Sequence, residues 1–270
     1  IAEAFLVGKK TDIEQILTKE FGTKLNSISQ YLHIVDIEGG KEAVDTAREA
    51  AHKAVEMVRT GVCEVLMKGL VNTDVILRAI LNKETGIHTS GTVLAFTSCF
   101  DIPAYHKLIF MTDPAVIPEP NKEQRIAMIN YCIETAKKFG VNKPKIALLH
   151  ATEVPNPKIR FMNDYLDIME HYHHGEFGDV IMDGPIDLFL AIDKKRGEIK
   201  NIPTPVLGDS DILIFPDFTS ANVFYKTVQT FGNADNAGLL YGANAPVVLT
   251  SRSDSTETKF YSICMACVLV

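Results

Sequence analysis

The sequence predicts an α/β protein, built on mostly parallel sheets with helices covering their faces. Strand-like and helix-like segments alternate from one end of the 270-residue chain to the other, which is typical of this fold class. Most of the strand-like runs are almost continuously apolar. Strands in a parallel sheet have that composition because helices bury both of their faces.

The predicted elements follow in order along the chain. Apolar runs predict strands at residues 5–8, 32–37, 62–68, 92–100, 108–112, 145–150, 180–183, 212–216 and 247–250. Helical spacing of apolar residues predicts helices at 11–21, 41–60, 73–83, 122–139, 158–171, 220–231 and 256–268. The helix over 41–60 has the clearest pattern, and Gly61 is its stop signal. Prolines 114, 118 and 120 indicate a change of direction or domain, and we expect the strand at 145–150 to open a second sheet.

Composition and charge restrict the function classes. The chain is 46% hydrophobic and has 27 basic against 34 acidic residues, a net charge of −7. This balance argues against general binding of nucleic acids or anionic membranes, and no apolar run is long enough to span a membrane. Five scattered cysteines favour a reducing cytoplasm over a disulfide framework. Because Ile1 directly precedes a strand-like run, we expect some N-terminal sequence to be missing or processed.

Three polar turns follow apolar strands and precede predicted helices. A helix N-terminus presents unpaired N–H groups and the positive end of the helix dipole, so it suits an anion. The candidate ligand-binding side chains are Lys68, Asn72, Thr73 and Arg78 in the first turn and its helix, Asn222, Tyr225 and Lys226 in the second, and Ser251 and Arg252 in the third. An anionic, phosphate-bearing ligand is the leading interpretation. Ordinary turns with surface cations are the alternative.

Other motifs carry less weight. The histidines within 171–174 lack the spacing of a helical metal pair, so we expect no metal site there. Cys264 and Cys267 form Cys-x-x-Cys in an apolar helical run, where two small buried hydrophobic residues are the simpler interpretation. Asp217 fits a hydrogen bond within its own turn as well as a catalytic role. The chain has no Gly-x-Gly-x-x-Gly, P-loop or Gly-x-Ser-x-Gly motif.

Read together, several segments resemble the phosphate acetyl/butyryltransferase family. They span most of the chain in order, at residues 68–73, 77–79, 182–185, 191–192, 208–213, 216–217, 221–222, 225–226 and 242–252. The turns at 67–73 and 250–255 look closer to the butyryl branch than to the acetyl branch.

The resemblance implies a fold, an assembly and a reaction. The fold is the two-domain isocitrate-dehydrogenase-like fold, with residues 1–120 plus 241–270 in one α/β domain, 121–240 inserted as the second, and the active site in the cleft between them. The assembly is a homodimer. The reaction converts acyl-CoA and inorganic phosphate reversibly into acyl phosphate and CoA. The family chemistry requires no metal or cofactor, and coenzyme A is a substrate. The acyl group is expected to be butyryl or a branched short chain.

Roles for the third turn and the first helix carry over residue by residue. Ser251 and Arg252 match the family's catalytic Ser-Arg pair, in which Arg252 binds the phosphoryl group and Ser251 donates to it or to the developing oxyanion. Arg78 matches an arginine that engages CoA. Residues of the second turn, Asn222, Tyr225 and Lys226, match a motif that lines the cleft.

One position departs from the acetyl branch, which has an aspartate as the proposed thiol base seven residues after the serine. Thr258 stands there and cannot act as a base, so Asp254 or Glu257 is left to substitute, or the thiol ionises unaided. Three alternatives stay open: a phosphate acetyltransferase, an NAD(P)-dependent hydroxyacid dehydrogenase of the same fold, and a non-catalytic CoA-binding protein.

Overall fold

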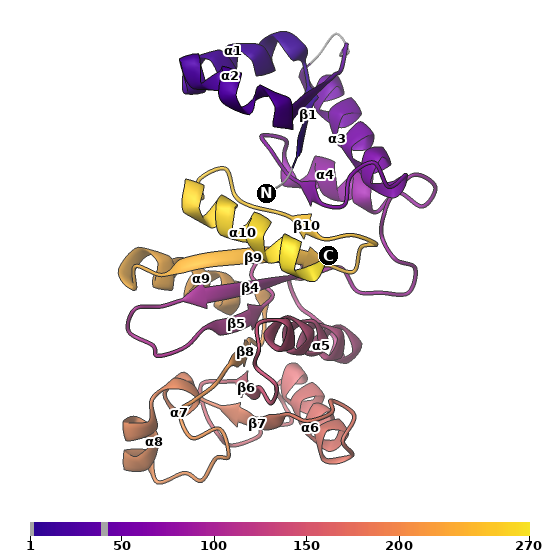
Figure 1. Cartoon of the computed structure of the whole chain (residues 1–270). Coiled ribbons are helices and arrows are strands. Elements are labelled where there is room, and N and C mark those ends of the chain that lie inside the picture. Colours follow the sequence, from indigo (N-terminus) through magenta and orange to yellow (C-terminus); the bar gives the residue numbers. More distant parts are fainter. Residues whose placement is uncertain (1–2, 39–42) are drawn as a thin grey trace. The chain divides into compact units, whose positions relative to one another are not determined.

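The computed structural model describes residues 3–38 and 43–270. Contacts between Cα atoms divide the chain into two units. The first unit contains the chain up to residue 90 together with 243–252, and the second contains 91–242 together with 253–270. Figure 1 shows these segments by their colours along the sequence.

Among its described residues, the first unit has two pairs of parallel strands and four α-helices. Strand β1 (Ala4–Gly8) pairs with β2 (Leu32–Asp36), and β3 (Leu66–Met67) pairs with β10 (Val247–Val248). The helices are α1 (Lys10–Phe21), α2 (Leu25–Ile28), α3 (Ala43–Arg59) and α4 (Thr73–Ile80). The expected start of the third predicted helix, at residues 41 and 42, lies outside the described residues.

The second unit is built on a sheet with the strand order β9-β4-β5-β8-β6-β7. Pairing is parallel between β5 and β8, β8 and β6, and β6 and β7, and it is antiparallel where β4 meets β5 and β9. The strands are β4 (Ala95–Asp101), β5 (Ile109–Thr112), β6 (Lys145–Leu149), β7 (Ile181–Ile186), β8 (Ile212–Ile214) and β9 (Asp235–Tyr241). The helices are α5 (Lys122–Lys138), α6 (Arg160–His173), α7 (Leu188–Ile192), α8 (Lys194–Lys200), α9 (Phe218–Phe231) and α10 (Thr256–Leu269).

Helices cover both faces of this sheet, as its apolar strands require. On β5, the Phe110 ring lies 5.7 Å from the ring of Phe139, which ends α5. The next residue, Met111, packs on the opposite face with Leu190 of α7 and Ala221 of α9. Neighbouring residues of a strand point to opposite faces, so β5 is buried on both. The prediction of an α/β protein with mostly parallel strands flanked by helices is confirmed.

Several elements differ from the expectation. The predicted strand at 62–68 shrinks to β3, because the N–H groups of Val62 and Cys63 both bond to the Met57 carbonyl and hold the chain against the end of α3. Strand β9 was not predicted because Asp235, Asn236 and Gly238 break its apolar pattern. Gly238 fits there since a Cβ would lie 2.4 Å from the Phe96 ring on the neighbouring strand. The short helices α2, α7 and α8 were also missed.

The expected second sheet does not begin at β6, which pairs with β8 and β7 in the sheet already formed by β4 and β5. The two units likewise divide the chain elsewhere than at residues 120 and 240. Residues 91–120 belong to the second unit because their strands pair with β9 and β8. Residues 253–270 belong there because α10 packs on β9.

Candidate active site

The first predicted turn and the third meet in the first unit. Strands β3 and β10 are parallel neighbours, with Leu66 opposite Val247 and Met67 opposite Val248. Both strands therefore end at the same edge, where Lys68 begins one turn and Ser251 and Arg252 form the other. The strand register therefore places the first and third polar turns at the same edge of this strand pair.

A hydrogen bond between side chains joins the two turns. The guanidinium of Arg252 donates from one terminal nitrogen to the amide oxygen of Asn72. Asn72 is the N-cap residue of α4 by its backbone conformation, but its side chain makes no capping bond. Asparagine is a common N-cap residue whose side chain accepts from the first helical N–H groups. The structure assigns the Asn72 side chain to Arg252 instead.

The two cations near the first turn have different environments. Lys68 is 5% exposed, and its ammonium donates to the carbonyl oxygens of Gly69 and Val71 at 3.3 and 3.5 Å. A buried lysine that donates to its own turn helps to set the shape of that turn. Arg78 is exposed in the last turn of α4, about 9 Å along the helix axis from Asn72.

The segment after Arg252 enters α10 in the second unit. Ser255 is its N-cap residue and accepts a hydrogen bond from the Thr258 N–H at 3.0 Å. The two candidate thiol bases differ in burial, because Asp254 is half-buried whereas Glu257 is exposed in the first helical turn. An exposed carboxylate at that position stabilises the helix through its dipole. Asp254 and Glu257 therefore differ in their surroundings, although both precede or begin the same helix.

The second predicted turn starts α9 in the second unit. Asp217 is the N-cap residue and accepts from the Ser220 N–H at 2.8 Å, which is the structural role considered for it. The Asn222 amide donates to the Pro114 carbonyl at 2.9 Å. Tyr225 is half-buried with its ring 5.2 Å from that of Phe100, and Lys226 is exposed.

Thr258 belongs to a buried polar network that sequence reasoning missed. Its hydroxyl donates to the amide oxygen of Asn236 at 3.0 Å, and the Gln229 amide donates to the same oxygen at 2.7 Å. The Asn236 amide nitrogen donates to the Tyr225 hydroxyl at 2.7 Å. The missing signal was strand β9, because without it nothing placed Asn236 beside α9 and α10.

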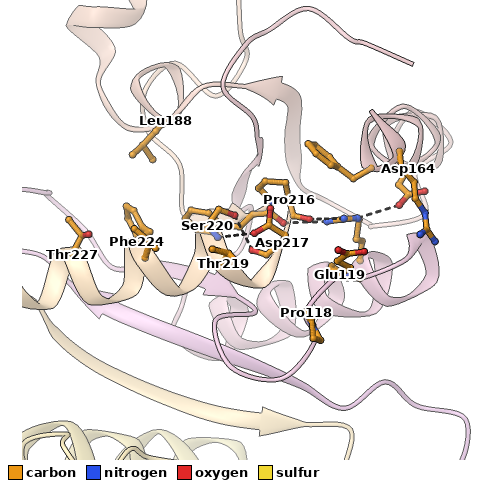
Figure 2. Close-up of a pocket in the computed structure, with 16 residues that line it drawn as sticks. Pro118, Glu119, Asp164, Leu188, Pro216, Asp217, Thr219, Ser220, Phe224 and Thr227 are labelled. Atoms are coloured by element: carbon orange, nitrogen blue, oxygen red, sulfur yellow. Dashed lines mark hydrogen bonds and ion pairs between the residues drawn. The ribbon is translucent and has the colours of Figure 1, made fainter. Parts of the chain in front are cut away.

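A cavity of about 930 Å³ opens on another face of α9 (Figure 2). Thr219, Phe224 and Thr227 of α9 line it. Its buried cation, Arg125, donates to the carbonyls of Phe215 and Pro216 and to Asp164. Since these contacts occupy the guanidinium, the arginine is a structural part of the wall. The side chains of Asn222 and Tyr225 are engaged elsewhere, so the predicted site residues do not line this cavity.

The histidine tract and the cysteines were the other motifs considered from the sequence. His171 pairs with Glu176 at 2.7 Å, and no group of three or more metal-ligating side chains gathers anywhere in residues 3–38 and 43–270. Within the same described residues, no helix combines the length and apolar character needed to cross a membrane. All five cysteines are free, and the expectation that Cys264 and Cys267 are both buried is wrong, because Cys264 is half-buried and Cys267 is exposed.

Known proteins resemble this chain over nearly its whole length. A family model described as phosphate acetyl/butaryl transferase matches residues 9–267. The phosphate butyryltransferase of Clostridium acetobutylicum is 36% identical over 269 residues, covering 100% of this chain and 85% of that protein. The phosphate acetyltransferase of Thermotoga maritima is 37% identical over 220 residues, covering 82% and 74%. The crystal structure of a branched-chain phosphotransacylase from Enterococcus faecalis V583 superposes with a TM-score of 0.79 at 29% identity, covering 99% of this chain and 98% of that one.

Proposed function

Because the chain belongs to the phosphate acetyl/butaryl transferase family, we propose that it transfers an acyl group reversibly between coenzyme A and inorganic phosphate. The acyl group is butyryl or a branched short chain. Two of the similar proteins support this choice by their names, a phosphate butyryltransferase and a branched-chain phosphotransacylase. Acetyl is the alternative, since a phosphate acetyltransferase is 37% identical over 82% of this chain.

The observation that carries the proposal is the contact between Arg252 and Asn72. The hydrogen bond from one terminal nitrogen to Asn72 favours one orientation of the Arg252 guanidinium, whose planar set of donors matches the oxygens of a phosphoryl group. Ser251 precedes it in the same turn and supplies a hydroxyl donor. Fixed donors aimed at developing charge lower a transition state more than mobile ones do.

The chemistry needs few groups beyond these. In the direction of acyl-CoA synthesis, the CoA thiol gives its proton to Asp254 and the sulfur attacks the carbonyl carbon of the acyl phosphate. The tetrahedral intermediate then breaks its carbon–oxygen bond, and phosphate leaves with both electrons of that bond. Arg252 and Ser251 stabilise this leaving anion. The proton returns from Asp254 to solvent, and no metal or cofactor takes part.

The test is a panel of substrates. The protein is mixed with phosphate and acetyl-, butyryl- or isobutyryl-CoA, and release of free thiol is followed. We expect the butyryl or isobutyryl ester to have the highest kcat/KM. A highest value for acetyl-CoA would replace the butyryl assignment. Binding of CoA without thiol release from any ester would leave a non-catalytic CoA-binding protein.

We also propose a homodimer in the cytoplasm. The homodimer follows from the family resemblance, and light scattering of the purified protein tests it: a mass near 29.8 kDa would contradict it. The cytoplasm is supported by five free cysteines, a pattern favoured by reducing compartments.

A further inference from the structure

The hydrogen bonds around Asn236 run in one order from donor to acceptor. The contacts of its amide oxygen and amide nitrogen fix that order. The Asn236 oxygen accepts two hydrogen bonds, from the Gln229 amide at 2.7 Å and from the Thr258 hydroxyl at 3.0 Å. The amide nitrogen of Asn236 must therefore face Tyr225, to which it donates at 2.7 Å.

The same direction is maintained at the start of α10. The Ser255 hydroxyl donates to the Thr258 hydroxyl at 3.3 Å, so the Thr258 oxygen accepts there and gives its own proton to Asn236. Thr258 is only 6% exposed, and Asn236 only 4%. Reversing this chain of hydrogen bonds would require rotating two amides and two hydroxyls, of which the Asn236 amide and the Thr258 hydroxyl are buried, and a buried polar group that loses its partner is costly.

Tyr225 is thereby left as a donor. Its oxygen accepts from Asn236, so its own proton is directed away from that amide. Burial is the main effect that raises the pKa of Tyr225 above its ordinary value, and the charge of Asp254 raises it further, while the amides of Asn236 and Gln229 act in the opposite sense. The hydroxyl therefore keeps its proton at neutral pH.

The proton left to Tyr225 indicates what kind of group it binds. Its oxygen already accepts from Asn236, so the hydroxyl has one hydrogen bond left to donate. A neutral carbonyl oxygen is an acceptor without a proton of its own and fits this single donor. Both the acyl group and the amides of the pantetheine arm offer such carbonyls.

We propose that Tyr225 donates a hydrogen bond to a carbonyl oxygen of the acyl-CoA, and that Thr258 and Asn236 are positioning residues that keep Tyr225 a donor. This inference rests on the proposed acyltransferase function. It also gives Thr258 a role that needs a hydroxyl. An ionised carboxylate at 258 would attract the Asn236 amide nitrogen and turn the amide oxygen toward Tyr225, which would draw the tyrosine proton inward.

The first experiment removes the donor. Tyr225→Phe is compared with Tyr241→Phe, a matched control on β9 whose hydroxyl lies 2.5 Å from that of Thr135 in the same unit. If the acceptor is the acyl carbonyl, Tyr225→Phe lowers kcat about 10²-fold with an unchanged KM, because the bond strengthens in the transition state. If it is a pantetheine amide, the KM for acyl-CoA rises about 5-fold and the KM for phosphate stays constant. The control changes neither constant.

The second experiment reverses the direction. Asn236→Asp is isosteric and, when ionised, can only accept, so it should reduce activity as much as Tyr225→Phe. In the Tyr225→Phe background, Asn236→Asp should lower activity no further, because the tyrosine proton that the carboxylate would accept is absent. Thr258→Val, which removes one of the donors that hold the amide, should lower activity about 3-fold alone and leave the Tyr225→Phe enzyme unchanged. Melting temperatures identify any variant that fails to fold. If one of Asn236→Asp and Thr258→Val fails to fold, the other still tests the positioning role.

Three results would overturn the inference. Tyr225→Phe could leave kcat and the KM for acyl-CoA unchanged, or change only the KM for phosphate. Asn236→Asp and Thr258→Val could instead keep their full cost in the Tyr225→Phe background, which would remove the positioning role. If the wild type releases no thiol, the proposed function fails by itself, and calorimetric affinity for CoA decides the inference: equal affinities of wild type and Tyr225→Phe would end it.

Discussion

The Arg252 turn and the Asn236 network hold functional side chains in opposite ways. The turn follows a strand of two residues, and its arginine is exposed and held by one exposed amide. The network lies in the second unit, where the Gln229 amide and the Thr258 hydroxyl both donate to the oxygen of the buried Asn236. An exposed group contributes little to the free energy of unfolding, whereas a buried polar group that loses its partner is costly. We therefore expect changes in the turn to affect the rate alone and changes in the interior to affect stability as well.

Arg252→Ala is the strongest test of this contrast. Removing the guanidinium takes away the donors proposed for the phosphoryl group, so kcat/KM should fall about 10²- to 10³-fold. The melting temperature should stay within about 1 °C of the wild type because the side chain is exposed. Arg252→Lys, which keeps the charge without the planar fork, should recover only part of the rate. Equal rates for wild type and Arg252→Ala would remove Arg252 from the site.

Asp254→Asn should have a smaller effect with a ceiling set by the thiol itself. A thiol with a pKa near 8.5 is about 3% ionised at pH 7, so a base can gain at most about 30-fold there. The loss in Asp254→Asn should approach 30-fold at pH 7 and disappear near pH 9. Glu257→Gln is the matched control and should leave the profile unchanged. A loss that persists at pH 9 would give Asp254 another role.

Much of this site was predictable from the sequence because polar turns after apolar strands must gather where parallel neighbours end. The pairing of β3 with β10 brings Lys68 and Arg252 to one edge as that rule expects. The side-chain partners were not predictable. Asn72 has the residue type of an N-cap and the backbone conformation of one, yet its side chain binds Arg252. Nothing local distinguishes these two uses of an asparagine.

The Asn236 network escaped prediction for a different reason. Strand β9 contains Gly238, which strand propensity disfavours but the close Phe96 ring requires. The fit between two strands is a tertiary property, and it overrides the local pattern. Without β9 the threonine at 258 reads only as a lost acid, whereas the structure places it in a hydrogen-bonded interior.

Asn72→Ala is compared with Asn121→Ala, because both asparagines stand at the N-cap position of a helix. Asn72 orients Arg252, so its loss should lower kcat/KM about 5-fold and change stability by only a few tenths of a kcal/mol. Asn121 caps α5 with a full capping box. Asn121→Ala should therefore cost about 1 kcal/mol of unfolding free energy and leave the rate unchanged. Urea unfolding measures the stability of each variant, and thiol release measures its rate. A loss of stability in Asn72→Ala together with a loss of rate in Asn121→Ala would contradict these roles.

Asp113→Asn has the smallest expected effect on the rate and tests the interior through pH. Asp113 is 2% exposed and accepts from the N–H groups of Ala115, Val116 and Ile117. Burial raises its pKa to about 6, against the lowering effect of these hydrogen bonds. A raised carboxyl pKa gives stability that is complete below about pH 4, the unfolded value, and is lost as the pH rises through about 6.

The wild type should accordingly lose up to about 3 kcal/mol of unfolding free energy between pH 4 and 7 that the variant does not lose.

Asp209 provides the opposite case within the same unit. Burial alone would raise its pKa, but hydrogen bonds from Lys145 and Lys107 hold that pKa below its ordinary value. Its contribution is therefore present above about pH 4 and is lost as the pH falls further. Asp209→Asn should flatten the acid limb and Asp113→Asn the limb between pH 4 and 7. Identical pH profiles for the two variants would show that their carboxyls do not differ as burial and charge require.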